Sequence, residues 1–131
     1  MKIAILISRV LLGTGFIFFG LNILHPFLAS PPPPAGSLAA QFVAVMVPSR
    51  WMALIGAVQL LGGILVLAGR TAPLGLVMLG PVLVNILAFH ICLAGGHGIA
   101  PGLVFSALEI LLIYGYRNYF RAIFTINALP A

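Results

Sequence analysis

The sequence predicts an all-α membrane protein, built as a four-helix bundle with a short extra interfacial helix between helices one and two. Three observations support this fold class: 63% of the 131 residues are hydrophobic, only 5% are charged, and the mean hydropathy is +1.26. So few polar residues cannot cover the water-facing surface of an ordinary soluble domain. Because a membrane-spanning helix needs roughly 20 mostly apolar residues, we expect residues 1–131 to form a single transmembrane domain with four spans.

The first predicted span covers residues 3–28 and begins after a lysine. Its basic start and the small residues Ala29 and Ser30 also fit a secretory signal peptide, which is the alternative. However, the apolar run has about 26 residues and is interrupted by Arg9, whereas the apolar region of a signal has roughly 7 to 15. We therefore expect a retained helix that ends near Pro26.

A proline-rich external loop and a short apolar segment separate this span from the next. Residues 30–37 read SPPPPAGS, and four consecutive prolines favour an extended polyproline II course. The apolar segment 38–47 has only about ten residues, which is too short to cross a bilayer. We expect this segment to lie at the membrane interface or to dip back between the spans.

Three further spans are predicted over residues 51–69, 72–93 and 102–117. Trp51 suits the aromatic belt at a membrane interface. Pro81 predicts a kink in the third span, because its ring removes a backbone hydrogen bond. A glycine-rich loop, GGHG, separates the third and fourth spans, and residues 118–131 are expected to form a partly amphipathic tail.

The basic residues predict which ends of the spans face the cytoplasm. With both termini cytoplasmic, only Arg50 lies outside, and five basic residues lie at or near the inner side: Lys2, Arg9, Arg70, Arg117 and Arg121. This bias follows the positive-inside rule and predicts a multi-pass protein of the cell (inner) membrane. Topology thus explains the formal charge of +5, and we expect the lipid bilayer, rather than a nucleic acid, as the surroundings of the chain.

Glu109 is the only acidic residue in the chain, with at least seven uncharged residues on either side. A carboxylate at the bilayer centre costs on the order of 2.5 to 3.5 kcal/mol on insertion scales, so it should find a partner. Helical-wheel arithmetic gives each span one interior stripe, and each stripe carries one strongly polar residue. We expect these residues, Arg9, Gln59, Asn85 and Glu109, to form a buried polar pocket in which Arg9 pairs with Glu109.

The stripes also contain small residues that allow helices to approach closely. They are Arg9, Gly13, Phe16 and Gly20 in the first span; Met52, Gln59, Gly63 and Val66 in the second; Met78, Pro81, Asn85, Phe89 and Cys92 in the third; and Gly102, Phe105, Glu109, Ile113 and Tyr116 in the fourth.

The polar set has a structural and a functional interpretation. As structural glue, its members would fix the register of the helices through hydrogen bonds worth about 0.6 kcal/mol each. As a functional site, they would line a cavity for a quinone head group, a proton or a small substrate, since an ionisable residue within the membrane is a functional hypothesis by default. No catalytic residue is identified, because the chain has no nucleotide-binding loop, catalytic serine elbow or haem attachment motif.

The histidines His25, His90 and His97 belong to the predicted outer side and are candidate ligand-binding residues there. A metal bound by all three is one alternative, but their spacing is not diagnostic, and we predict no metal site. Cys92 is the only cysteine, which excludes an intramolecular disulfide and a multi-cysteine metal site.

Three stretches carry a resemblance to a known family. RVLLGTGFIFFGLN, which begins at Arg9, resembles the first helix of DoxX-like membrane proteins, which are compact four-helix bundles. GAVQLLGGILVLAGR, from Gly56, resembles the family's second helix, and LGPVLVNILAFH, from Leu79, is similar to the third helix of its smaller members. The resemblance covers roughly residues 8–116, and the chain departs from it at Gln59, where many relatives carry a carboxylate.

The resemblance implies a small subunit of a redox or quinone-linked membrane system, and at most the membrane subunit of an oxidoreductase complex. It implies quinone as the candidate cofactor and a membrane or peripheral protein as the redox partner, and a homo-oligomer is left open. A small transporter is an alternative, although minimal multidrug exporters carry a carboxylate in the first helix, where this chain has Arg9. A structural membrane scaffold without catalytic activity is the other alternative.

Overall fold

A computed structural model describes residues 1–124, and this part of the chain is all-helical, with no strand. Its helices are α1 (Lys2–Leu24), α2 (Leu38–Met46), α3 (Trp51–Ala68), α4 (Ala72–Ala88), the π-helix η1 (Phe89–Leu93), α5 (Ala100–Gly115), α6 (Arg117–Phe120) and the 3-10 helix η2 (Arg121–Phe124). Of the tail expected over 118–131, residues 125–131 lie outside the described residues.

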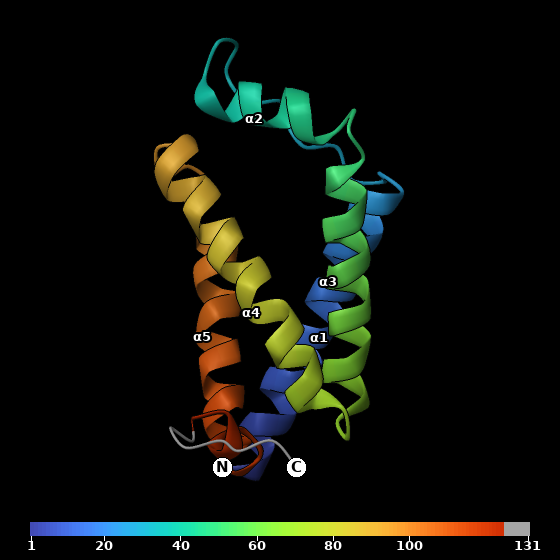
Figure 1. Cartoon of the computed structure of the whole chain (residues 1–131), viewed down its shortest axis with the longest axis vertical. Coiled ribbons are helices and arrows are strands. Elements are labelled where there is room, and N and C mark those ends of the chain that lie inside the picture. Colours follow the sequence, from blue (N-terminus) through green and yellow to red (C-terminus); the bar gives the residue numbers. More distant parts are fainter. Residues whose placement is uncertain (125–131) are drawn as a thin grey trace.

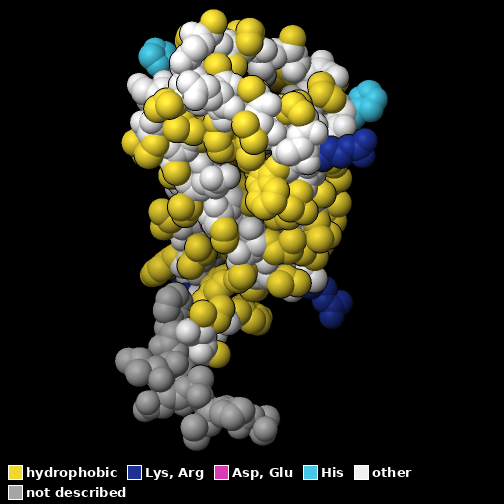
Figure 2. Space-filling view, turned by 45° about the horizontal axis from the view of Figure 1, so that its top comes forward, with side chains coloured by type: hydrophobic (Ala, Val, Ile, Leu, Met, Phe, Trp, Pro, Cys, Tyr) yellow, Lys and Arg dark blue, Asp and Glu magenta, His cyan; other side chains and the backbone are white. Residues whose placement is uncertain are grey.

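Three helices are long and apolar enough to cross a membrane: α1 with 23 residues, α3 with 18, and α4 continued by η1 with 22. The apolar helix α5 has only 16 residues, or about 24 Å at a rise of 1.5 Å per residue. Hydrophobic side chains cover much of the flank seen in Figure 2, and Lys and Arg side chains lie at its margins. These features fit a protein embedded in a membrane.

The long helices α1, α3, α4 and α5 run side by side, and α2 lies across one end of them (Figure 1). We call this the α2 end. At the opposite end, α1 begins and α3 and α5 finish, so that Ile5 packs against Gly115, and Arg9 against Gly69. We call this the Lys2 end.

The most extensive contact between helices joins α1 and α3. A Cβ atom on Gly20 would lie 2.8 Å from the carbonyl oxygen of Gly56, and one on Gly63 would lie 2.8 Å from the carbonyl oxygen of Gly13. Glycine is therefore required for this close approach, in which van der Waals packing stabilises the pair. The glycines of the first two predicted stripes are buried here, which confirms the interior faces predicted for these spans.

The interior face of α4 differs from the predicted stripe. Its buried residues are Ala72, Gly75, Leu76, Leu79, Val82 and Leu83. Gly75 lies against α3, where a Cβ atom would be 2.7 Å from the Val66 side chain. Pro81, Asn85 and Cys92 are exposed instead. The prediction placed the polar Asn85 inside, whereas a small residue and leucines make the contact with α3.

The first helix ends at Leu24, four residues before the predicted limit at residue 28. His25 has φ −139° and ψ 88°, and it precedes Pro26, a position at which the helical conformation is disfavoured. The Asn22 side chain then accepts hydrogen bonds from the backbone N–H groups of the next loop residues, Phe27 and Leu28, at 3.1 and 2.7 Å. Asn22 thus fixes the path by which the chain leaves α1 toward α2.

Candidate functional site

A cavity of about 480 Å³ lies beneath α2 and is lined by residues of α1, α2, α3, α4, η1 and α5. Its volume falls in the range of roughly 300 to 1,000 Å³ that is usual for small-molecule sites. Much of its wall is aromatic, and the phenylalanines that line it are Phe16, Phe19, Phe42, Phe89 and Phe105. Its polar lining residues are Asn22, Ser30, Gln59, Asn85 and His90.

The aromatic walls are held by ring contacts between helices. On one side, the ring of Phe105 lies 5.3 Å from that of Phe16 and 5.9 Å from that of Phe19, which joins α5 to α1. On the other side, Phe42 of α2 lies 5.4 Å from Phe89 of η1. Such edge-on and tilted contacts stabilise aromatic pairs. The walls offer flat apolar surfaces suited to a ring-shaped ligand.

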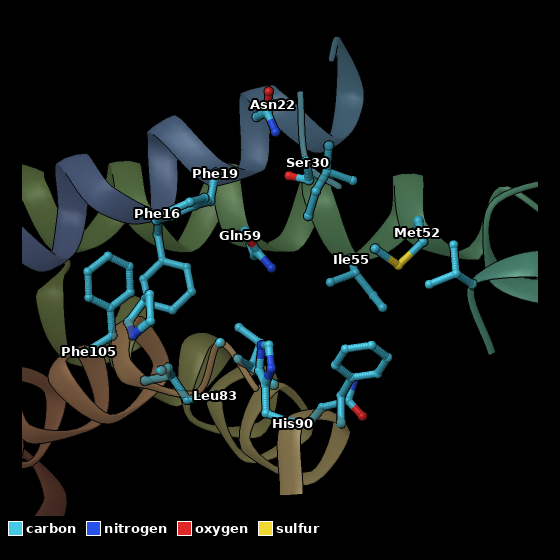
Figure 3. A pocket seen from close by; sticks show the side chains of 18 of the residues that line it. Phe16, Phe19, Asn22, Ser30, Met52, Ile55, Gln59, Leu83, His90 and Phe105 are labelled. Atoms are coloured by element: carbon cyan, nitrogen blue, oxygen red, sulfur yellow. The ribbon is translucent and has the colours of Figure 1, made fainter. Parts of the chain in front are cut away.

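Gln59 brings an unpaired polar group to this apolar cavity. Its side chain is only 3% exposed, and its Oε1 atom has no hydrogen-bond partner among residues 1–124. It belongs to the face of α3 that also carries Gly56 and Gly63, so the packing of α1 against α3 holds it in place. A buried amide without a partner costs about 1 to 3 kcal/mol. Figure 3 shows Gln59 directed into the cavity with its amide nitrogen foremost, where a ligand can accept a hydrogen bond from it.

His90 faces Gln59 from the opposite wall (Figure 3). It belongs to the π-helix η1, and such turns are frequent at functional sites. The His90 Nδ1 atom lies 2.6 Å from the backbone carbonyl oxygen of His97. The loop that returns this carbonyl to His90 contains Gly96 with φ 86° and Gly98 with φ 72°, a left-handed conformation that glycine adopts without strain.

Asn85 lines the same cavity, but its own side chain is exposed. It precedes Phe89 by about one helical turn. Pro101, on α5, also lines the cavity and is exposed. Two residues of the cavity lining, Asn85 and Pro101, thus also lie at the surface of the molecule.

Glu109 lies outside the lining of this cavity. Its side chain is 3% exposed, and neither carboxyl oxygen has a hydrogen-bond partner among the described residues. One of these oxygens, Oε1, would lie 3.3 Å from a Cβ atom on Gly80, so the carboxyl group packs close to the backbone of α4. The predicted pair with Arg9 is not formed.

Arg9 points toward the Lys2 end instead. Its Nη1 atom donates to the Tyr116 hydroxyl at 3.5 Å, and that hydroxyl donates to the carbonyl oxygen of Gly69 at 3.5 Å. Gly69 is the C-cap of α3, and the last carbonyl groups of a helix attract a cation. Of the four predicted polar residues, the structure therefore brings Gln59 and Asn85 to one cavity and leaves Arg9 and Glu109 outside its lining.

The three histidines do not form a joint site. His90 lines the cavity, whereas His25 and His97 are exposed and do not line it. His97 Nδ1 lies 2.9 Å from the carbonyl oxygen of Ala94, within its own loop. Among residues 1–124, no group of three His, Cys, Asp or Glu side chains lies close enough to hold a metal ion.

The aromatic lining of the cavity was predicted only in part, since Phe16, Phe89 and Phe105 belong to predicted interior stripes. Phe42 comes from the interfacial segment, and Phe19 lies off the predicted stripe of the first span. One feature of the sequence could have indicated an aromatic lining: phenylalanines are concentrated in those halves of the spans that lie nearest the interfacial segment 38–47. The chain matches no protein-family model, no curated protein and no solved structure. The cavity and its residues are therefore the basis for assigning a function.

Proposed function

We propose that the protein is a DoxX-like four-helix membrane bundle, a small subunit of a redox or quinone-linked membrane system, and that the cavity beneath α2 binds a quinone-type ring. The observation that carries this proposal is the Gln59 side chain, which is 3% exposed and lies between aromatic walls, and whose Oε1 atom lacks a partner within the described part of the chain. A quinone head group combines a flat ring with polar oxygens at opposite edges. It therefore matches a site that has aromatic walls and polar groups on facing sides.

The architecture proposed for this subunit uses α5 as its fourth span. α5 is short, with 16 residues, but it packs along α1 and α4, and α6 follows it after a break at Tyr116. Lys2 and Arg117 line one hollow at the Lys2 end, and Arg9 packs against the end of α3. Under the positive-inside rule, this end with both termini faces the cytoplasm of a cell (inner) membrane. The cavity then lies toward the outer side.

The subunit would pass electrons through a membrane or peripheral redox partner. In this role the chain binds and orients the ring, and its aromatic walls exclude water. Asn85 and Pro101 line the cavity and are also exposed, which suits a ligand that arrives from the bilayer.

Ligand titration of the purified protein in lipid nanodiscs tests this proposal. The probe is 2,3-dimethoxy-5-methyl-1,4-benzoquinone, and its binding is measured by isothermal titration calorimetry. We expect saturable binding that Gln59→Leu weakens by about two- to tenfold, because one hydrogen bond is worth about 0.5 to 1.5 kcal/mol. The matched control is Gln41→Leu, since Gln41 is exposed on α2 and does not line the cavity.

Unchanged binding by Gln41→Leu together with weakened binding by Gln59→Leu supports the proposal. Absence of saturable binding to the unmodified protein contradicts it, as does equal weakening by the two variants. If Gln59→Leu changes only the melting temperature and the probe does not bind, the scaffold interpretation is favoured instead.

A further inference from the structure

The hydrogen bond of His90 determines which of its ring nitrogens carries the proton. Nδ1 lies 2.6 Å from the His97 carbonyl oxygen. A carbonyl oxygen can only accept, so Nδ1 is the donor of this bond. In the neutral imidazole the second nitrogen, Nε2, then has a lone pair and acts as an acceptor. The cavity wall formed by His90 therefore offers an acceptor, not a donor, to a bound molecule.

The His90 ring is held in this orientation by its surroundings. Its ring lies 5.2 Å from that of Phe89 in an edge-on contact. The loop backbone crosses close to it, so that a Cβ atom on Gly98 would lie 3.2 Å from His90 Cε1. The acceptor nitrogen is therefore placed before a ligand arrives, which lowers the entropic cost of forming a hydrogen bond.

Gln59 does not discriminate between donors and acceptors. A primary amide has both N–H donors and a carbonyl acceptor, so it can recognise a hydroxyl or a carbonyl group. The discrimination therefore lies with His90, on the facing wall (Figure 3). A ring oxygen that carries a hydrogen can donate to Nε2. A carbonyl oxygen at the same place is itself an acceptor, so it cannot form a hydrogen bond with Nε2.

We infer that the cavity binds the reduced, dihydroxy form of a quinone-type ring in preference to the oxidised dione, with His90 Nε2 accepting a hydrogen bond from one hydroxyl. This inference rests on the proposed function and names the form of the ligand that the site selects. The opposite ring oxygen lies toward Gln59, and the ring occupies the space between the phenylalanine walls. A dione at the same position leaves its carbonyl and the imidazole lone pair unsatisfied, a loss that desolvation makes costly.

Three probes that share one ring test the preference. They are 2,3-dimethoxy-5-methyl-1,4-benzoquinone, its hydroquinone, and the dimethyl ether of that hydroquinone, which keeps the ring but has no O–H donor. The hydroquinone is kept reduced with excess dithionite, which leaves the protein intact because its one cysteine is free. With the protein in nanodiscs, we expect the hydroquinone to bind about three- to tenfold more tightly than the dione or the dimethyl ether.

Substitutions assign the preference to His90. His90→Phe keeps an aromatic ring without an acceptor, and we expect the ratio of the two dissociation constants to fall to about one. His25→Phe is the matched control, because His25 is exposed and does not line the cavity, and its ratio should equal that of the unmodified protein. Circular dichroism reports whether each variant folds. If His90→Phe does not fold, His90→Gln replaces it, because a primary amide can donate to a dione carbonyl and accept from a diol hydroxyl.

The outcomes separate this inference from the function on which it rests. Equal binding of hydroquinone and dione, tighter binding of the dione, or an unchanged ratio in the His90 variants overturns the preference while the quinone site stands. Binding of none of the three probes overturns the proposed function and the preference with it. A ratio above about three that is lost in the His90 variant and kept in the His25 variant supports both.

Discussion

The Arg9 guanidinium lies against Gly69, the residue at which α3 ends, and the Tyr116 hydroxyl bridges the two from α5. Three of the long helices thus meet through one arginine at the Lys2 end. Gly69 has φ 81°, and a Cβ atom there would collide with the guanidinium. The half-buried charge of Arg9 therefore lies at the end of α3 and does not neutralise Glu109.

Gly69→Ala should destabilise the protein through both strain and collision. A non-glycine residue with positive φ costs on the order of 1 kcal/mol, and displacement of the Arg9 side chain adds to this. Gly36→Ala is the matched control, because Gly36 has φ 78° but nothing within 4 Å of the added Cβ. We expect a clearly larger fall in Tm for Gly69→Ala, measured in the same detergent; equal falls would contradict the contact with Arg9.

Tyr116→Phe removes the hydroxyl that bridges Arg9 and Gly69. We expect a loss of about 0.5 to 1.5 kcal/mol in the free energy of unfolding, the usual range for one hydrogen bond. Tyr119→Phe serves as the control, since Tyr119 is 72% exposed. Chemical denaturation compares the two, and a Tyr116 variant as stable as the Tyr119 variant would argue against the bridge.

Gly20→Ala tests the close packing of α1 on α3. The new Cβ atom would lie 2.7 Å from the Leu60 nitrogen and 2.8 Å from the Gly56 oxygen, and these backbone atoms cannot move aside without parting the helices. We expect a cost of about 1 to 3 kcal/mol. Gly102→Ala is expected to cost less, because its Cβ atom would meet flexible side chains of Leu87 and Ile86 at 3.1 Å and 3.3 Å. The reverse order of Tm values would contradict this packing.

The sequence carried enough information for part of this architecture. Glycine spacing predicted the interior faces of α1 and α3, since close helix approach leaves a local pattern of small residues. The apolar runs predicted the three helices that are long enough to cross a membrane, and the length of segment 38–47 predicted a helix that does not run with the others. The register between helices has no such local pattern. For this reason helical-wheel arithmetic placed Arg9 and Glu109 on interior faces, but it could not predict the direction in which the Arg9 side chain extends.

The site was less predictable than the spans. Gln59 was recognised because a polar residue within an apolar run is rare, and His90 was recognised only as one of three histidines. The hydrogen bond of His90 depends on the π-helix at Phe89–Leu93 and on a loop of glycines with positive φ, neither of which follows from hydropathy. Phe42 reaches the cavity from α2, and this contact depends on how the chain returns after α1.

Glu109→Leu tests whether the lone carboxyl group stabilises the helices. Neither carboxyl oxygen has a hydrogen-bond partner among the residues that the structure describes. Removal of the carboxyl group therefore breaks no polar contact seen there and relieves the cost of burying a polar group. We expect a Tm equal to that of the unmodified protein or higher by several degrees. A marked fall in Tm would show that Glu109 has a stabilising partner and would support the interpretation of the polar residues as structural glue.

The central claim is that a quinone-type ring occupies the cavity between Gln59 and His90. Photolabelling in lipid vesicles tests it most directly, with an azido derivative of 2,3-dimethoxy-5-methyl-1,4-benzoquinone and mass spectrometry to locate the adducts. We expect adducts on cavity residues such as Met52 and Phe89, which both line the site, and we expect these adducts to be lost when excess unlabelled quinone competes. Adducts confined to exposed flank residues such as Leu74 and Ile110, undiminished by competition, would contradict it.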